Sequence, residues 1–176
     1  MLGMHGTYQA NMAMHNADLI LAIGARFDDR ITNTPEKFAP KAQIVHFDAD
    51  HSSVSKIIEA DIAVFGQVKD SLRAINELIK DRLSELDITK FDEWHAQISK
   101  WRSEHGLNHN LYKDNSDENP ILPQAAVQHI YQESKGKAFV TSDVGQHQMF
   151  AAQYYHFDEP RNCLLYTSPS PRDRNV

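Results

Sequence analysis

The sequence predicts an α/β fold with a parallel sheet in its first half. Three short apolar runs, at 19–23, 44–47 and 62–65, are each followed by a Gly or an Asp. Continuous apolar runs of this length are typical of parallel strands that helices cover on both faces. Leu and Ile then recur every three or four residues over 72–86, which predicts an amphipathic helix of about five turns. The alternation of strand and helix signals is the pattern of a βαβ unit.

Shorter signals fill the spaces between these elements. Residues 10–15 have the composition of one or two helical turns, and three serines at 52–55 can cap a short helix that reaches Ile58. Aromatic and aliphatic residues mark one face of a helix over 91–101, and a polar stretch follows it up to Pro120. We interpret 88–121 as a connector between two domains, with 1–87 as the first of them.

A second α/β pattern begins after this connector, over 122–161. It comprises a helix that starts at Pro123, a strand over 138–141, a turn over 142–145 and a helix over 146–155. One strand and two helices are too few to close a hydrophobic core, so this second domain is expected to be incomplete. Residues 162–176 contain two prolines and no apolar periodicity, which predicts disorder. Their deletion is then expected to change stability by less than about 0.5 kcal/mol.

Composition excludes several classes of function. The chain has 176 residues and a net charge of −6, so no basic field attracts nucleic acid. No apolar run is long enough to cross a membrane, and the first residues do not resemble a signal peptide. A single cysteine, Cys163, leaves no intrachain disulfide or cysteine-rich metal site. The ten histidines show no zinc-binding spacing. These features predict a soluble intracellular protein.

Polar residues follow the first two predicted strands, where ligands bind in parallel sheets. The segment Gly24–Arg30 offers a flexible turn and a guanidinium at Arg26 that can bind phosphate or carboxylate. Asp48 and Asp50 follow the second strand and can accept hydrogen bonds from ribose hydroxyls. A solvated charged loop explains the first segment equally well, and spacing alone favours a helix cap for the second. Neither GxGxxG nor a Walker motif is present.

The segment 142–147 also lies at the predicted carboxyl end of a strand, directly before a helix. Backbone N–H groups at such a position point toward an anion, and Gln146 and His147 add side-chain donors. A capped helix with a surface histidine is the simpler explanation on spacing alone.

Longer stretches resemble a known family. The segments MLGMHGTYQANMAMHNADLILAIGARFDDRITN and HFDADHSSVSKIIEADIAVFGQVKDSL resemble the central domain of the acetolactate (acetohydroxyacid) synthase large subunit. AFVTSDVGQHQMFAAQYYHFDEPR is similar to the start of the third domain of that enzyme. The resemblance extends to about residue 161 and implies a Rossmann-like, FAD-holding central domain and part of a thiamine-diphosphate-binding domain. Residues 162–176 do not match, so a gene fragment with a non-native tail is expected.

The resemblance implies roles for individual residues. The expected FAD contacts are His5, Gly6, Gly24, Arg26, Asp48, Ala49 and Gln67. The family usually has Asp where this chain has Gln67, although an amide oxygen can also accept a hydrogen bond. The expected substrate-channel residues are Met4, Asp29 and Arg30, and the expected thiamine diphosphate contacts are Val144, Gly145, Gln146 and His147. The glutamate that activates thiamine and the Mg²⁺-binding motif have no counterpart in this chain.

The implied reaction joins two pyruvate molecules, or pyruvate and 2-oxobutyrate, with loss of CO2. The products are 2-acetolactate and 2-aceto-2-hydroxybutyrate, the precursors of valine, leucine and isoleucine. The family works with FAD, thiamine diphosphate and Mg²⁺, as a large-subunit dimer or tetramer with a small regulatory subunit. A bacterial, cytoplasmic enzyme is expected, and this chain alone is expected to be inactive. The alternatives are a related FAD enzyme, such as glyoxylate carboligase or pyruvate oxidase, or a non-catalytic nucleotide-binding module.

Overall fold

The computed structural model describes residues 1–109, 111 and 121–165. The chain divides into two compact units, Met1–Gly106 and Leu107–Val176. The predicted boundary at residue 87 differs from this division because the helix over 92–105 packs against the first helix of unit 1.

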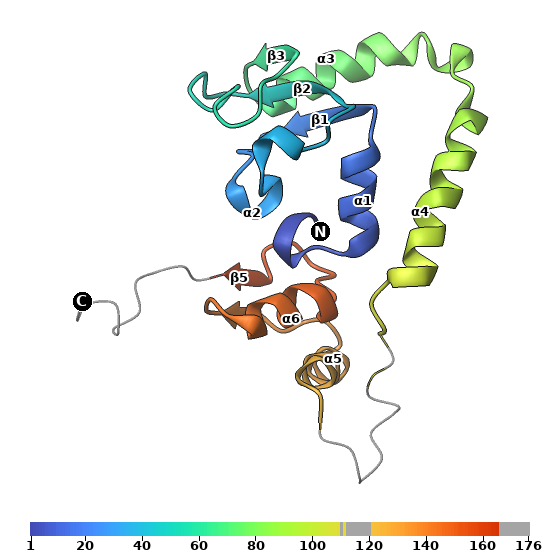
Figure 1. Ribbon diagram of the computed structural model, residues 1–176. Helices are drawn as coiled ribbons and strands as arrows, with labels where there is room; N and C mark the ends of the chain where they lie inside the picture. Colours follow the sequence, from blue (N-terminus) through green and yellow to red (C-terminus); the bar gives the residue numbers. More distant parts are fainter. Residues whose placement is uncertain (110, 112–120, 166–176) are drawn as a thin grey trace. The chain divides into compact units, whose positions relative to one another are not determined.

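A three-stranded parallel sheet forms the centre of unit 1 (Figure 1). Its strands are β1 (Leu19–Ile23), β2 (Gln43–Asp48) and β3 (Ile62–Phe65), in the order β1-β2-β3. In register, Leu21 of β1 faces Val45 of β2, and Val45 faces Ile62 of β3. The three strands, their parallel pairing and the α/β class are therefore as the sequence predicts.

The core of unit 1 lies on one face of this sheet. Ala22, Phe27, Ile44 and Ile58 are buried there, with partly buried Phe38 packed against them. On the other face of β1, Leu19 and Leu21 are 50% and 53% exposed. The expectation of strands covered on both faces is thus wrong for β1, whereas β2 buries Ile44 on one face and Phe47 on the other. The helix that follows β3 packs against β2 and leaves this face of β1 uncovered.

Four α-helices accompany the sheet. They are α1 (Tyr8–Asn16), α2 (Asp29–Thr32), α3 (Val68–Lys80) and α4 (Asp92–His105). Short 3-10 turns are η1 (Gly3–His5), η2 (Pro35–Lys37), η3 (Leu83–Glu85) and η4 (Ile88–Phe91).

Helix α3 is shorter than the predicted helix and begins earlier. It starts at Val68 and ends at Lys80, whereas the apolar repeat continues to Leu86. Leu83 and Leu86 are both exposed, so no packing supports a further turn there. Most helical stability in proteins comes from such packing rather than from intrinsic propensity.

In its described residues, unit 2 has two α-helices and a second, smaller sheet. The helices are α5 (Pro123–Ser134) and α6 (Gln146–Tyr154), and the strands are β4 (Val140–Ser142) and β5 (Cys163–Leu165). The residue after α5, Lys135, adopts the left-handed conformation and terminates the helix directly before Gly136. Strand β4 begins two residues later than the predicted strand, and α6 begins as predicted and ends one residue earlier.

Aromatic rings join the ends of α5 and α6. Tyr131 packs edge-on against Tyr155 and donates a hydrogen bond from its hydroxyl to Asp158, at 2.8 Å. His109 lies against Tyr154 and His156, with ring centroids 5.6 and 5.0 Å away. Burial and the nearby His156 lower the pKa of His109. These contacts bring residues that follow α6, and His109, against the aromatic side chains of the two helices.

Strand β5 corrects the prediction of disorder from residue 162, as far as residue 165. β5 pairs with β4 in parallel, Val140 with Cys163 and Ser142 with Leu165. The backbone N–H of Val140 also donates to the carbonyl of Asn162, at 2.8 Å, and Asn162 is buried. A strand of three residues is too short for an apolar pattern that predicts it from sequence. It forms because the partner strand β4 supplies the hydrogen bonds. Residues 166–176 lie outside the described residues.

Deletion of residues 162–176 should therefore destabilise unit 2. A backbone hydrogen bond contributes about 0.5–1.5 kcal/mol, so we expect the loss of β5 to cost about 1–3 kcal/mol. A control chain that ends at residue 165 keeps β5 and separates its effect from that of the remaining residues. Hydrogen exchange at the Val140 amide, together with thermal melts, measures the difference. Equal exchange rates in the two truncated chains would contradict the prediction.

Candidate cofactor-binding site

The three strands of unit 1 end at one edge, where two glycines leave open space. The N–H of Gly24 donates to Phe47 at 2.8 Å, and the N–H of Gly66 donates to Asp48 at 3.1 Å. Gly24 and Gly66 have φ of 63° and 144°. A Cβ at either position would meet no heavy atom nearer than 3.9 Å. The edge can therefore admit a ligand close to the backbone, as the carboxyl edge of a parallel sheet commonly does.

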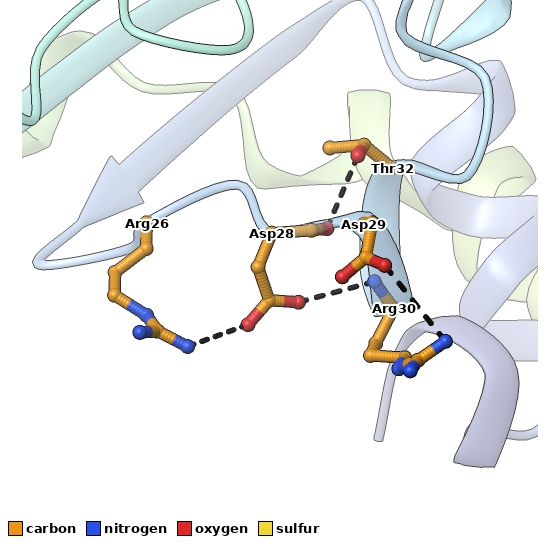
Figure 2. Close-up of polar contacts among 5 residues, drawn as sticks. All are labelled: Arg26, Asp28, Asp29, Arg30 and Thr32. Carbon is orange, nitrogen blue, oxygen red and sulfur yellow. Dashed lines mark hydrogen bonds and ion pairs between the residues drawn. The ribbon is translucent and has the colours of Figure 1, made fainter.

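Asp28 organises the loop that carries Arg26 (Figure 2). One carboxylate oxygen of Asp28 accepts from the Arg26 guanidinium at 2.8 Å, and the other accepts from the N–H of Arg30 at 3.2 Å. The carbonyl of Asp28 accepts from the Thr32 hydroxyl at 3.1 Å, so the same residue caps α2. Asp29 and Arg30 form a longer ion pair at 3.8 Å. The Arg26 side chain stays 79% exposed and is oriented by its ion pair.

Two residues that sequence reasoning did not single out fix the base of this loop. His46 is fully buried, and its Nε2 donates to the carbonyl of Ala25 at 2.8 Å. Phe27 has φ of 53° and packs edge-on against His46 and Phe38. A positive φ at a bulky residue is strained and persists only where packing holds it. A histidine within an apolar strand was the only sequence signal for this anchor.

The acidic segment after β2 is held by Asp50 rather than by a helix. The Asp50 carboxylate accepts from the N–H of Ser52 at 2.9 Å and from its hydroxyl at 2.8 Å. These hydrogen bonds lower the pKa of Asp50. The predicted short helix over 52–58 is wrong, because this segment forms turns and Ser55 has φ of 57°. Asp48 accepts from the N–H of Asp50 at 2.8 Å, while Ala49 lies between them at the edge of the sheet.

A cavity of about 360 Å³ lies next to this edge. Arg26 and Lys56 bring two cationic groups to it, Asp28 and Asp29 bring two carboxylates, and Ser53 adds a hydroxyl. Lys56, which was not among the predicted site residues, lies in the turns after β2. The guanidinium, the ammonium and the hydroxyl can each donate a hydrogen bond to an anionic group such as a diphosphate, which would compete with the two carboxylates for them.

A second cavity, of about 500 Å³, brings the three expected channel residues together. Met4, Asp29 and Arg30 line it. The Asn11 side chain accepts a hydrogen bond from the N–H of Gly3 at 2.7 Å and donates one to the carbonyl of Gly3 at 3.0 Å. These two bonds fix the turn that carries Met4. His5 and Gly6 line neither cavity. Gln67 precedes α3 and makes no side-chain capping bond.

In unit 2, the predicted residues form a single turn at the start of α6. Val144 is exposed, and its N–H is bound by the Asp143 carboxylate at 2.7 Å. Gly145 has φ of 156°, and a Cβ there would lie 2.7 Å from the His147 ring. Gln146 and His147 begin the helix and are exposed. A helix N-terminus with two added donors fits a diphosphate.

Comparison with known proteins identifies the relationship. Residues 1–75 match the family model for the thiamine pyrophosphate enzyme central domain. The chain is 46% identical over 164 residues, 93% of its length, to the acetolactate synthase isozyme 3 large subunit of Escherichia coli K12. The chain is a homologue of acetolactate synthase large subunits. The corresponding protein of Buchnera aphidicola from Schlechtendalia chinensis is 49% identical over the same length. Chloroplastic acetolactate synthase 3 of Brassica napus is 40% identical.

The homologous region is only part of these relatives. The chain spans 28% of the Escherichia coli acetolactate synthase subunit and 24% of the Brassica napus protein, about a quarter of their length. Both cavities and all three strand ends lie within residues 1–75, the part that matches the central domain. The turn at Val144–His147 lies beyond that match.

The described residues contain neither a metal-binding cluster of side chains nor a membrane-spanning helix. No group of three or more histidine, cysteine, aspartate or glutamate side chains is arranged there to hold a metal ion. Within the same residues, no helix is long and apolar enough to cross a membrane.

Proposed function

We propose that this chain provides cofactor-binding and substrate-channel surfaces of an acetolactate synthase large subunit. The identity of 46% with the Escherichia coli subunit, over 93% of this chain, carries the proposal. The reaction would join pyruvate to a second pyruvate or to 2-oxobutyrate, with loss of CO2. The relatives reported above are all acetolactate synthases, and none of them favours an oxidase, a glyoxylate carboligase or a non-catalytic module.

Unit 1 would hold FAD at the carboxyl edge of its sheet. The open backbone at Gly24 and Gly66 and the cations Arg26 and Lys56 suit a dinucleotide with a diphosphate. Asp48 would accept hydrogen bonds from a sugar hydroxyl. His5, Gly6, Ala49 and Gln67 remain proposed contacts on the strength of the resemblance alone.

Unit 2 would hold the diphosphate of thiamine diphosphate at the start of α6. Gln146, His147 and the backbone N–H of Gly145 would bind it there, beside Val144, whose own N–H donates to the Asp143 carboxylate. When bound, thiamine diphosphate supplies the electron sink for the loss of CO2 from a 2-oxoacid. We assign no Mg²⁺ ligand and no catalytic residue to the described part of the chain.

The larger cavity of unit 1 would form part of the path for the 2-oxoacid. The planar guanidinium of Arg30 can bind a carboxylate through two hydrogen bonds, and its ion pair with Asp29 is long and exposed. Met4 would provide apolar contact for the methyl end of pyruvate. We further propose that the complete protein works in the bacterial cytoplasm as a dimer or tetramer with a small regulatory subunit.

A chimaeric enzyme tests the proposed function. Residues 1–161 would replace the corresponding segment of the Escherichia coli isozyme 3 large subunit. We expect the chimaera to form acetolactate from pyruvate with FAD, Mg²⁺ and thiamine diphosphate, because the transplanted surfaces would hold the same cofactors. The 176-residue chain alone is expected to form none.

The matched control is the chimaera with Gly145→Ala. Gly145 has φ of 156°, which L side chains rarely adopt, and a Cβ there would displace the His147 ring 2.7 Å away, so activity should fall at least about tenfold. A chimaera that is folded by circular dichroism, but inactive at every cofactor concentration, would contradict the proposal.

A further inference from the structure

Two aromatic rings that no proposed contact uses stack at the cofactor edge of unit 1. The rings of His51 and Phe65 are parallel within 1°, with centroids 4.0 Å apart. His51 lies in the turns after β2, and Phe65 is the last residue of β3. Phe65 also pairs in register with Asp48. We call His51 and Phe65 the aromatic platform.

Packing of the core does not explain this platform. Phe65 is 47% exposed and His51 is exposed, and neither belongs to the buried cluster around Phe27 and Ile44. A parallel stack covers one face of each ring and leaves the other faces for a further planar group. Exposed aromatic rings of this kind are typical surfaces for the stacking of nucleic-acid bases.

The surroundings of the platform suit a purine nucleoside rather than an isolated ring. Asp48, the register partner of Phe65, offers carboxylate oxygens to a sugar. Gly66 follows Phe65 directly, and a Cβ there would meet only the Ser71 hydroxyl, at 3.9 Å. The cations Arg26 and Lys56 line a cavity of the same unit, together with Asp28, Asp29 and Ser53 of the turns that follow β1 and β2. A stacking surface, a sugar acceptor and phosphate-binding cations therefore belong to one sheet edge.

We propose that the aromatic platform binds the adenine ring of the bound dinucleotide. The proposal rests on FAD binding by unit 1 and adds His51 and Phe65 to its contacts. The base would stack on the outer face of the pair, with its ribose toward Asp48 and its diphosphate toward Arg26. Recognition would come from the flat purine surface, so ADP should bind to the same rings.

The first experiment compares FAD with FMN, which lacks the adenosine, on the full 176-residue chain by flavin fluorescence. Stacking of one base contributes about 1–3 kcal/mol, so His51→Ala should weaken FAD binding about 5- to 100-fold and leave FMN binding unchanged. His51→Phe keeps a flat ring and should restore the affinity. The matched control is His95→Ala, an exposed histidine on α4 of the same unit.

The second experiment titrates ADP and follows the ring protons of His51 and Phe65 by NMR. A stacked purine shifts these signals upfield, whereas the His95 signals should not move. If FAD fails to bind but ADP shifts both rings, the platform stands and the proposed FAD site is wrong. If FAD binds equally to the wild type and His51→Ala, or ADP leaves both rings unchanged, the platform is wrong.

Discussion

Replacement of Arg26 by Ala should lower the affinity of the chain for FAD about 10- to 100-fold. A hydrogen bond to a charged group contributes about 1.5–3 kcal/mol, and the loss of one such contact to a phosphate gives this range. The guanidinium is exposed, and its only described ion pair is with Asp28, so a phosphate can share it at little cost. Without Arg26, the negative charge of Asp28 would also repel the ligand. Flavin fluorescence titrations on the two proteins measure the change.

Arg73→Ala is the matched control for this measurement. Arg73 lies on the surface of α3, where its ion pair with Asp70 at 3.8 Å is similarly exposed. Its removal tests the loss of one positive charge from unit 1 without a change at the sheet edge. Arg26→Lys keeps the charge but not the planar donors, so its affinity should fall between those of the wild type and the alanine variant. Equal affinities for the wild type and Arg26→Ala would disprove the assigned role.

Phe27→Ala should destabilise unit 1 by about 3–5 kcal/mol, the usual cost of deleting a buried phenyl ring. Phe27 is 6% exposed and is the largest side chain in the cluster with Ala22, Ile44 and Ile58. Loss of the phenyl ring leaves a cavity beside His46 and Phe38. Alanine is also strained at the φ of 53°, so the substitution relieves no backbone strain in compensation. Because Arg26 is the preceding residue, FAD affinity should fall with stability.

Tryptophan fluorescence during urea unfolding measures this effect on unit 1 alone. Both tryptophans of the chain, Trp94 and Trp101, lie on α4 and pack edge to face, with ring centroids 5.9 Å apart. Phe91→Ala serves as the control, because Phe91 is exposed and its removal should change stability by less than about 0.5 kcal/mol. A loss below about 1 kcal/mol for Phe27→Ala would show that the cluster is not the core of this unit.

Much of unit 1 could be predicted from local sequence. The strands β1, β2 and β3 are continuous apolar runs with a turn residue directly after or at the end of each, and such runs specify a strand without knowledge of the neighbours. The segments Gly24–Arg30 and Val144–His147 could likewise be placed at strand ends. Their relation to a known family followed from the similarity of longer stretches of sequence, because neither segment carries a general nucleotide-binding motif.

Where long-range contacts decide the structure, the local patterns were misleading. The serines after β2 have the composition of a helix start, yet Asp50 captures Ser52 and holds turns instead. Strand β5 has no periodicity, because its three residues gain order only by pairing with β4. Apolar runs also could not reveal that one face of β1 stays exposed, since a run has the same composition whether or not a helix covers it.

The sequence by itself determined the α/β class, the positions of the three strands of unit 1 and the resemblance to acetolactate synthase large subunits. Only the tertiary structure decided which side chains meet at the sheet edge. It placed Lys56 and Arg26 around one cavity, His46 against the Ala25 carbonyl of the loop, and His51 against Phe65. The physical reason is that strand and helix signals repeat every two to four residues, whereas these contacts join residues 14 to 30 positions apart. Such pairs are brought together by the parallel register of the sheet, which no short window of sequence contains.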